Sequence, residues 1–152
     1  MSYLIDTSVL VRTINVGNPL QSAAIDSLSL LRTQGETLCV VPQNLIEFWA
    51  VATRPLSANG LGITLEEAEN QIAEIKLHFI LKPEDETIFE NWESLVKIYH
   101  VSGKTTHDAR IVAAMQTHRM KNLLTFNISD FQRYSPLIAI ESPLDIISQN
   151  QT

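Results

Sequence analysis

The sequence has a single cysteine, little charge and no long apolar run, and each shortage excludes a class of protein. Cys39 stands between Leu38 and Val40, a context typical of a buried strand, which argues against a disulfide scaffold, a cysteine-based zinc site and a secreted protein. No apolar run approaches the roughly 20 residues that cross a bilayer, and no basic region followed by an apolar one opens the chain. We therefore expect a cytoplasmic protein that does not contact a membrane.

Positive charge is also scarce. The formal net charge of −6 argues against a nonspecific nucleic-acid coat. The acids concentrate between residues 66 and 93, whereas Lys104, Arg110 and Arg119, which are candidate phosphate contacts, come later in the chain. This distribution is compatible with a localised basic region that binds an anionic substrate, and equally with an ordinary acidic surface. The four histidines show no zinc-motif spacing, and no glycine-rich turn follows the first apolar stretch, which argues against a dinucleotide site.

Short apolar stretches alternate with longer helical patterns along the chain, as in an α/β domain with a parallel sheet. The expected strands cover residues 3–5, 37–41, 78–81, 122–125 and 137–140. The expected helices cover residues 7–15, 20–33, 43–53, 64–77, 83–100 and 106–119. Thr64 with Glu67, and Thr105 with Asp108, have the spacing of capping boxes. At 152 residues the chain is most simply one domain over residues 1–147, followed by a frayed polar tail over residues 148–152.

Asp6 follows directly after the first expected strand. The carboxyl ends of the strands of an open parallel sheet are where sites form, so an acid at this position is a candidate site residue. Asp is also a favoured N-cap, and the helix expected from Thr7 gives Asp6 a purely structural alternative. The two interpretations remain open for Asp6 taken alone.

Two further acids fall on helices. Glu47 lies in a helix that is apolar almost all round, and a buried carboxylate without a partner is costly, so such groups are paired or bind metal. Gln43 and Arg54 could instead define a polar stripe on which Glu47 is exposed. Asp108 stands in the first turn of its helix, where an acid is favoured by the helix dipole alone.

Asn127 and Asp130 follow the strand expected to end at Thr125, in a loop where such residues are common for local reasons. Together with Asp6, Glu47 and Asp108 they would converge on one end of a parallel sheet. Crowded carboxylates repel one another unless cations neutralise them, and oxygen ligands of this type bind Mg²⁺ or Mn²⁺. A metal held there would suit phosphodiester hydrolysis.

The segments Leu-Ile-Asp6-Thr-Ser, Asn44-Leu-Ile-Glu47-Phe, Thr-His-Asp108-Ala-Arg and Thr-Phe-Asn127-Ile-Ser-Asp130-Phe resemble, in order and spacing, the four motifs of PIN-domain nucleases, and most closely the VapC type of toxin–antitoxin pairs. The resemblance spans residues 3 to about 140. It implies a Rossmann-like three-layer α/β/α fold with strand order 3-2-1-4-5. It also implies Mg²⁺-dependent cleavage of RNA, with Mn²⁺ as a possible substitute, and Asp6, Glu47 and Asp108 as metal ligands.

Asn127 departs from the family pattern because many relatives have a fourth acid there. An amide oxygen carries less charge, which puts a second metal in question, and Asp130 is a candidate substitute. Ser8 and Asn44 are candidates to support Asp6 and Glu47. The resemblance further implies a homodimer and a cognate antitoxin, with helices 20–33 and 64–80 as candidate faces, although these helices could equally be plain core.

Two other classes of function remain as alternatives. A non-catalytic PIN-like module that binds RNA or protein would explain the loss of the fourth acid, but retention of the other three acids argues against it. A phosphotransfer enzyme using Asp6 would require a second Asp at position 8, where this chain has Ser8. A receiver domain would require paired acids on the first strand, which do not occur.

Overall fold

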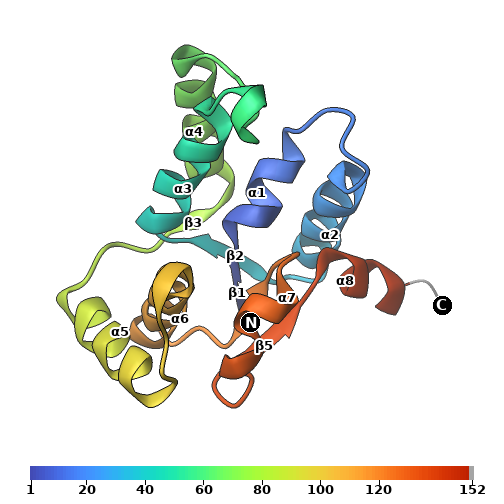
Figure 1. Ribbon diagram of the computed structural model, residues 1–152. Helices are drawn as coiled ribbons and strands as arrows, with labels where there is room; N and C mark the ends of the chain where they lie inside the picture. The colour runs from blue at the N-terminus through green and yellow to red at the C-terminus, as the bar shows by residue number, and fades with distance from the viewer. Residues whose placement is uncertain (151–152) are drawn as a thin grey trace.

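A five-stranded parallel sheet forms the centre of the protein in a computed structural model that describes residues 1–150 (Figure 1). The strands lie in the order β3-β2-β1-β4-β5, so the order implied by the family resemblance is confirmed. The strands are β1 (Ser2–Ile5), β2 (Thr37–Val40), β3 (Ile80–Leu81), β4 (Asn122–Leu124) and β5 (Ala139–Glu141). Leu4 of β1 pairs with Cys39 of β2 on one side and Leu123 of β4 on the other.

Eight α-helices connect and follow these strands within residues 1–150: α1 (Thr7–Thr13), α2 (Gln21–Thr33), α3 (Pro42–Thr53), α4 (Leu65–His78), α5 (Glu86–Ile98), α6 (Thr106–Thr117), α7 (Ile128–Phe131) and α8 (Pro143–Gln149). Three short 3₁₀ turns complete the described chain: η1 (Leu56–Ala58), η2 (Gly103–Thr105) and η3 (Gln132–Tyr134). All six helices expected from the sequence are present, with ends that differ by a few residues.

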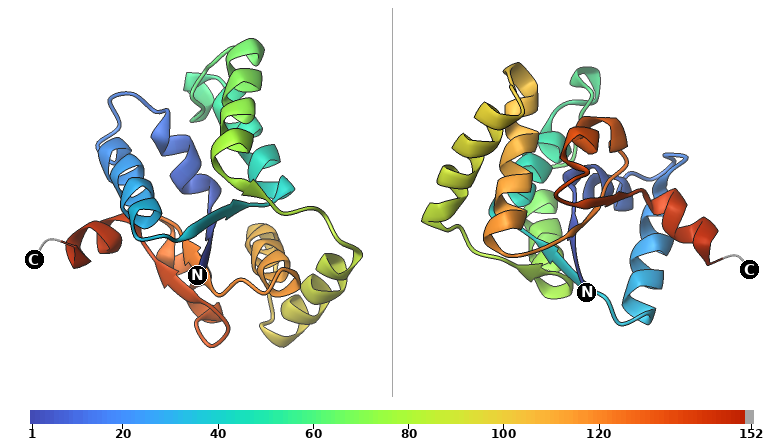
Figure 2. Two further views of the ribbon diagram at one scale, coloured as in Figure 1. Left: turned by 180° about the vertical axis from the view of Figure 1, so that it is seen from behind. Right: turned by 90° about the horizontal axis from the view of Figure 1, so that it is seen from below.

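The sheet is covered on both faces, which explains why its central strands are apolar throughout. Successive side chains of a strand point to opposite faces. Leu4 of β1 accordingly packs into one core with residues of α5 and α6, whereas Tyr3 and Ile5 pack into a second core with residues of α1, α2 and α3. Figures 1 and 2 show α5 and α6 together on one side of the sheet, with α1, α2 and α8 on the other. The three-layer α/β/α architecture is therefore confirmed.

Local hydrogen bonds decide where the helices begin. Thr64 caps α4 as expected, because its Oγ1 accepts from the amide of Glu67 at 3.1 Å. The capping expected of Thr105 is wrong: its hydroxyl donates to the carbonyl of Ser102 at 2.8 Å, inside the 3₁₀ turn that precedes α6. Helix α5 begins at Glu86 rather than residue 83, because the carboxylate of Asp85 accepts from the amide of Thr87 at 2.7 Å.

The C-terminal segment is more ordered than the sequence suggested. Ser142 and Asp145 form a reciprocal capping box, with Ser142 Oγ 3.1 Å from the amide of Asp145 and Asp145 Oδ2 3.0 Å from the amide of Ser142. Helix α8 starts there and packs on α2. The frayed tail expected from residue 148 is wrong for Ser148 and Gln149, which are helical, while residues 151–152 lie outside the described part of the chain. The domain boundary at residue 147 stays a prediction.

The last strand is displaced from its expected position. Strand β5 covers Ala139–Glu141 rather than residues 137–140. The amides of Leu137 and Ile138 both donate to the carbonyl of Tyr134, at 2.8 Å and 3.1 Å, so they close a turn instead of entering the sheet. Over residues 1–150, no helix combines the length and the apolar composition that crossing a membrane requires.

Candidate active site

Asp6 lies at the carboxyl end of the central strand, and its side chain is only 6% exposed. Its backbone amide donates to the carbonyl of Leu124 at 2.9 Å, which extends the pairing of β1 with β4. Asp6 occupies the N-cap position of α1, but its side chain makes no capping hydrogen bond. The carboxylate is therefore not explained by helix capping and points instead to a site at this edge of the sheet.

Two hydroxyl groups orient this carboxylate. Ser8 Oγ donates to Asp6 Oδ2 at 2.7 Å, and Thr125 Oγ1 donates to the same oxygen at 2.8 Å. Each hydroxyl also accepts a backbone amide of the loop after β4: Ser8 that of Phe126 at 3.1 Å, and Thr125 that of Asn127 at 2.9 Å. This arrangement confirms that Ser8 supports Asp6 and adds Thr125, a buried residue that sequence reasoning did not single out.

We expect Thr125→Val to destabilise the protein by about 1–3 kcal/mol, because it leaves a buried carboxylate oxygen and the amide of Asn127 each without one partner. Thr125→Ser retains the hydroxyl and should recover most of the loss. Urea unfolding of the two variants beside the wild type measures the difference. Equal free energies of unfolding for the Val and Ser variants would show that the hydroxyl contributes nothing.

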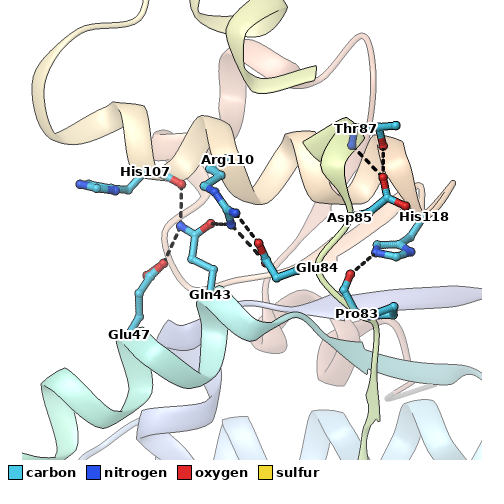
Figure 3. A network of polar contacts seen from close by, with 9 residues as sticks. All are labelled: Gln43, Glu47, Pro83, Glu84, Asp85, Thr87, His107, Arg110 and His118. Carbon is cyan, nitrogen blue, oxygen red and sulfur yellow. Dashed lines mark hydrogen bonds and ion pairs between the residues drawn. The ribbon is translucent and has the colours of Figure 1, made fainter. Parts of the chain in front are cut away.

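Glu47 reaches the same end of the sheet from α3 and is half-buried. Gln43, one turn earlier, holds it in place: Gln43 Nε2 donates to Glu47 Oε1 at 2.8 Å and to the carbonyl of His107 at 2.8 Å (Figure 3). Gln43 is thus a positioning partner that ties α3 to α6. Asn44 is fully buried, and its Oδ1 accepts from the amide of Val41 at 2.9 Å, so it fixes the start of α3.

Asp108 lies in the first turn of α6. Its pKa is raised to about 7, mainly by burial and then by the negative charges of Asp130, Asp6 and Glu47. Burial also raises the pKa of Glu47, and the charge of Asp6 adds to the effect. Burial raises the pKa of Asp6, although the hydrogen bonds from Ser8 and Thr125 act to lower it. These four carboxylates therefore lie close enough to one another for their charges to interact.

Asn127 and Asp130 sit at the start of α7, and both are exposed. The charge of Asp130 acts on the site: it is the second-largest cause, next to burial, of the raised pKa of Asp108. Asn127 contacts the site through its backbone, whose amide donates to Thr125 Oγ1. The assignment of catalytic roles to these two residues stays a prediction.

The donor set suits a hard divalent cation. Within residues 1–150, no three His, Cys, Asp or Glu side chains stand close enough to ligate one ion together. Mg²⁺ usually keeps several waters and is bound through one or two carboxylates, so a tight three-carboxylate cage is not required. Burial raises the pKa of Asp108 most, and the repulsion from the neighbouring carboxylates raises it further; a bound cation relieves that repulsion. Asp6, Glu47 and Asp108 remain the predicted ligands.

Of the candidate carboxylates, Glu47 borders a hollow of about 580 Å³, whose lining also includes Gln43, His107 and Arg110. Arg110 Nη2 lies 2.6 Å from Glu84 Oε2, and Arg110 Nη1 lies 3.3 Å from Gln43 Oε1. Figure 3 shows this chain of polar contacts running from Glu47 through Gln43 to Arg110 and Glu84. One basic residue predicted as a phosphate contact, Arg110, therefore borders the site.

The chain belongs to the PIN-domain family, because the family model described as PIN domain matches residues 3–135. Its fold is similar to that of VapBC2 from Rickettsia felis bound to a DNA fragment from their promoter, at 17% identity and a TM-score of 0.67, covering 93% of this chain and 98% of that chain. VapBC-1 from nontypeable Haemophilus influenzae aligns at 16% identity and a TM-score of 0.66, covering 95% and 99% of the two chains.

A third solved structure with this fold is Mycobacterium tuberculosis VapC20, a Sarcin-Ricin loop cleaving toxin. It aligns at 19% identity and a TM-score of 0.61, covering 86% of this chain and 94% of that chain. At such identities the likeness to solved structures establishes the fold alone. No curated protein matches the sequence.

Proposed function

We propose that this protein is an endoribonuclease that hydrolyses RNA phosphodiester bonds with Mg²⁺, or with Mn²⁺ in its place. The observation that carries the proposal is the gathering of Asp6, Glu47, Asp108 and Asp130: the pKa of Asp108 is raised to about 7, first by burial and then by the charges of the other three. Unpaired carboxylates held together in this way are costly unless they have a function. Membership of the PIN-domain family and the fold shared with VapC20, a Sarcin-Ricin loop cleaving toxin, support the same reaction.

Asp6, Glu47 and Asp108 would hold the cation, one or two of them directly and the rest through its bound waters. When bound, such an ion activates water as a nucleophile and offsets the negative charge that develops on the phosphate. Ser8 and Thr125 keep the Asp6 carboxylate oriented, and Gln43 does the same for Glu47. Asp130, whose charge raises the pKa of Asp108, or Asn127 would orient water or assist a second ion. The expected products carry a 5′-phosphate and a 3′-hydroxyl.

We further propose that the protein acts in the cytoplasm as the toxin of a toxin–antitoxin pair and forms a homodimer. The support is the fold shared with VapBC2 and VapBC-1. Helix α4 carries exposed apolar side chains at Leu65 and Leu77, and a groove of about 220 Å³ runs between α1, α2 and α4. These features suit the protein contacts expected of helices 20–33 and 64–80, and co-purification with the product of an adjacent reading frame tests them.

Incubation of the purified protein with RNA under three conditions tests the enzymatic proposal. We expect cleavage with Mg²⁺ or Mn²⁺, none with EDTA, and recovery when the metal is restored. Mass spectrometry of the fragments should show 5′-phosphate ends. If the protein binds RNA but cleaves none of a set of structured and unstructured RNAs with either metal, the alternative of a catalytically inactive RNA-binding module is correct.

A further inference from the structure

A groove leads away from Glu47 towards α5. The hollow beside Glu47 is bordered by Gln43, Ile46, Glu47, Glu84, His107 and Arg110. A second hollow of about 240 Å³ is bordered by Phe89, Trp92, Thr106, His107 and Arg110. Because His107 and Arg110 border both, the two hollows lie side by side, and we name them together the aromatic groove. One end of this groove is bordered by Glu47 of the candidate active site, and the other by a pair of aromatic rings.

The aromatic end has the features of a stacking surface. Phe89 is 60% exposed, and its ring lies 5.5 Å from that of Trp92, centroid to centroid, at an interplanar angle of 35°. The indole of Trp92 is fixed, because its Nε1 donates to the carbonyl of Thr106 at 2.8 Å. A fixed and partly exposed aromatic pair is what unpaired nucleic-acid bases stack on.

Arg110 stands between the aromatic pair and Glu47, where a phosphate of the bound strand would pass. Its present partner is Glu84, and the two side chains are 33% and 50% exposed. An ion pair this exposed contributes little stability, so a phosphate can replace the carboxylate. A guanidinium group suits phosphate because it donates two parallel hydrogen bonds. The ion pair therefore positions the Arg110 side chain in the groove and still allows a phosphate to replace Glu84 as its partner.

We propose that the aromatic groove binds unpaired nucleotides of the RNA strand next to the cleaved bond, with a base stacked on Phe89 and Trp92 and a phosphate on Arg110. This assignment rests on the proposed ribonuclease function and adds to it a preference for single-stranded RNA, since a duplex keeps its base faces inside the stack. RNA is favoured over a peptide because the groove starts at Glu47, a proposed metal ligand, and contains an arginine that can exchange partners.

Fluorescence of Trp92 reports the stacking directly. The chain has two tryptophans, so Trp49→Phe leaves Trp92 as the sole reporter. Titration with an unstructured oligoribonucleotide in EDTA, where no cleavage occurs, should quench this fluorescence. Adding Phe89→Ala should raise the Kd about tenfold, because one base–aromatic stack is lost. Ile98→Ala is the matched control, since Ile98 lies on the same helix and is 69% exposed, and it should leave the Kd unchanged.

A second variant acts in the opposite direction. Glu84→Gln releases Arg110 from its ion pair and should tighten binding of the oligoribonucleotide about threefold at low salt. The gain should shrink at high salt, where exposed charges are screened. A perfectly paired RNA duplex should bind weakly, and its Kd should be the same with and without Phe89→Ala.

Three results would overturn the assignment: equal Kd values for the Phe89→Ala and Ile98→Ala proteins, equal binding of duplex and single strand, or quenching of Trp92 only by a protein partner. The outcome is separable from that of the ribonuclease proposal. If cleavage depends on metal and the Phe89→Ala protein cleaves and binds RNA like the wild type, the RNA-binding role of the aromatic groove is rejected and the ribonuclease proposal stands. Stacking that is lost in Phe89→Ala, in a protein that cleaves nothing with Mg²⁺ or Mn²⁺, rejects the nuclease and keeps the groove as an RNA site.

Discussion

Asp6→Asn should lower Mg²⁺-dependent RNA cleavage by about three orders of magnitude, the loss expected when several kcal/mol of metal-based stabilisation disappears. The substitution removes one negative charge at the centre of the site and keeps the shape of the side chain. Ser8 and Thr125 can still donate to the remaining amide oxygen, so the local structure should survive. The initial rate of cleavage at saturating Mg²⁺ measures the effect.

Asp26→Asn is the matched control, because Asp26 is an exposed acid on α2. This variant should cleave like the wild type. Asp6→Asn should also unfold at the same temperature as the wild type or higher, since a carboxylate whose pKa is raised by burial is replaced by a neutral group. Cleavage by the Asp6→Asn protein at the wild-type rate would remove Asp6 from the mechanism.

Stability without metal should fall as the pH rises towards and through 7, and Mg²⁺ should restore it. The pKa of Asp108 is about 7 in the folded protein, against 3.8 for an unperturbed Asp. Because the folded state binds the proton more tightly, this contribution is complete below about pH 4 and is lost as the pH rises through 7. The full shift would correspond to about 4 kcal/mol, and screening of the half-exposed site reduces this to about 1–2 kcal/mol.

Urea unfolding between pH 5 and 8, in EDTA and in Mg²⁺, tests this linkage. The Asp108→Asn protein is the control, and its stability in EDTA should vary less with pH over the same range. The raised pKa of Asp108 also predicts that Mg²⁺ binds more tightly at pH 8 than at pH 6, because binding requires the deprotonated carboxylate. A wild-type profile that matches that of Asp108→Asn in both buffers would refute the electrostatic coupling.

Much of the fold and the outline of the site follow from local sequence signals. The apolar stretch Tyr3-Leu-Ile followed by Asp6 predicts a buried strand that ends at the carboxyl edge of a sheet. This prediction needs no information from elsewhere in the chain. Glu47 was identifiable because a carboxylate on an apolar helix needs a partner. The partner is Gln43, one turn away, which faces α6 rather than open solvent; Arg54, the other residue of the polar stripe considered as an alternative, is exposed at the end of α3.

The residues that sequence reasoning missed act across long distances in the chain. Thr125 looks like an ordinary strand residue, and its bond to Asp6 joins positions 119 residues apart. Phe89 and Trp92 look like part of a helix face, and only the packing of α5 against α6 places them beside Arg110. Helix α8 was missed for a different reason: Ser142 and Asp145 carry a capping signal, but the polar residues from 148 onward suggested a tail.

The central position of β1 has a consequence for how the protein is made. Strand β1, which Asp6 follows, is synthesised well before one of its two neighbours in the sheet, β4, which begins at Asn122. The Asp6 carboxylate acquires its second hydroxyl partner only with Thr125, whose amide in turn donates to the carbonyl of Glu141 at 2.9 Å. A growing chain therefore lacks the complete carboxylate site until β4 and β5 have been made, so the proposed nuclease would become active only after these strands join the sheet.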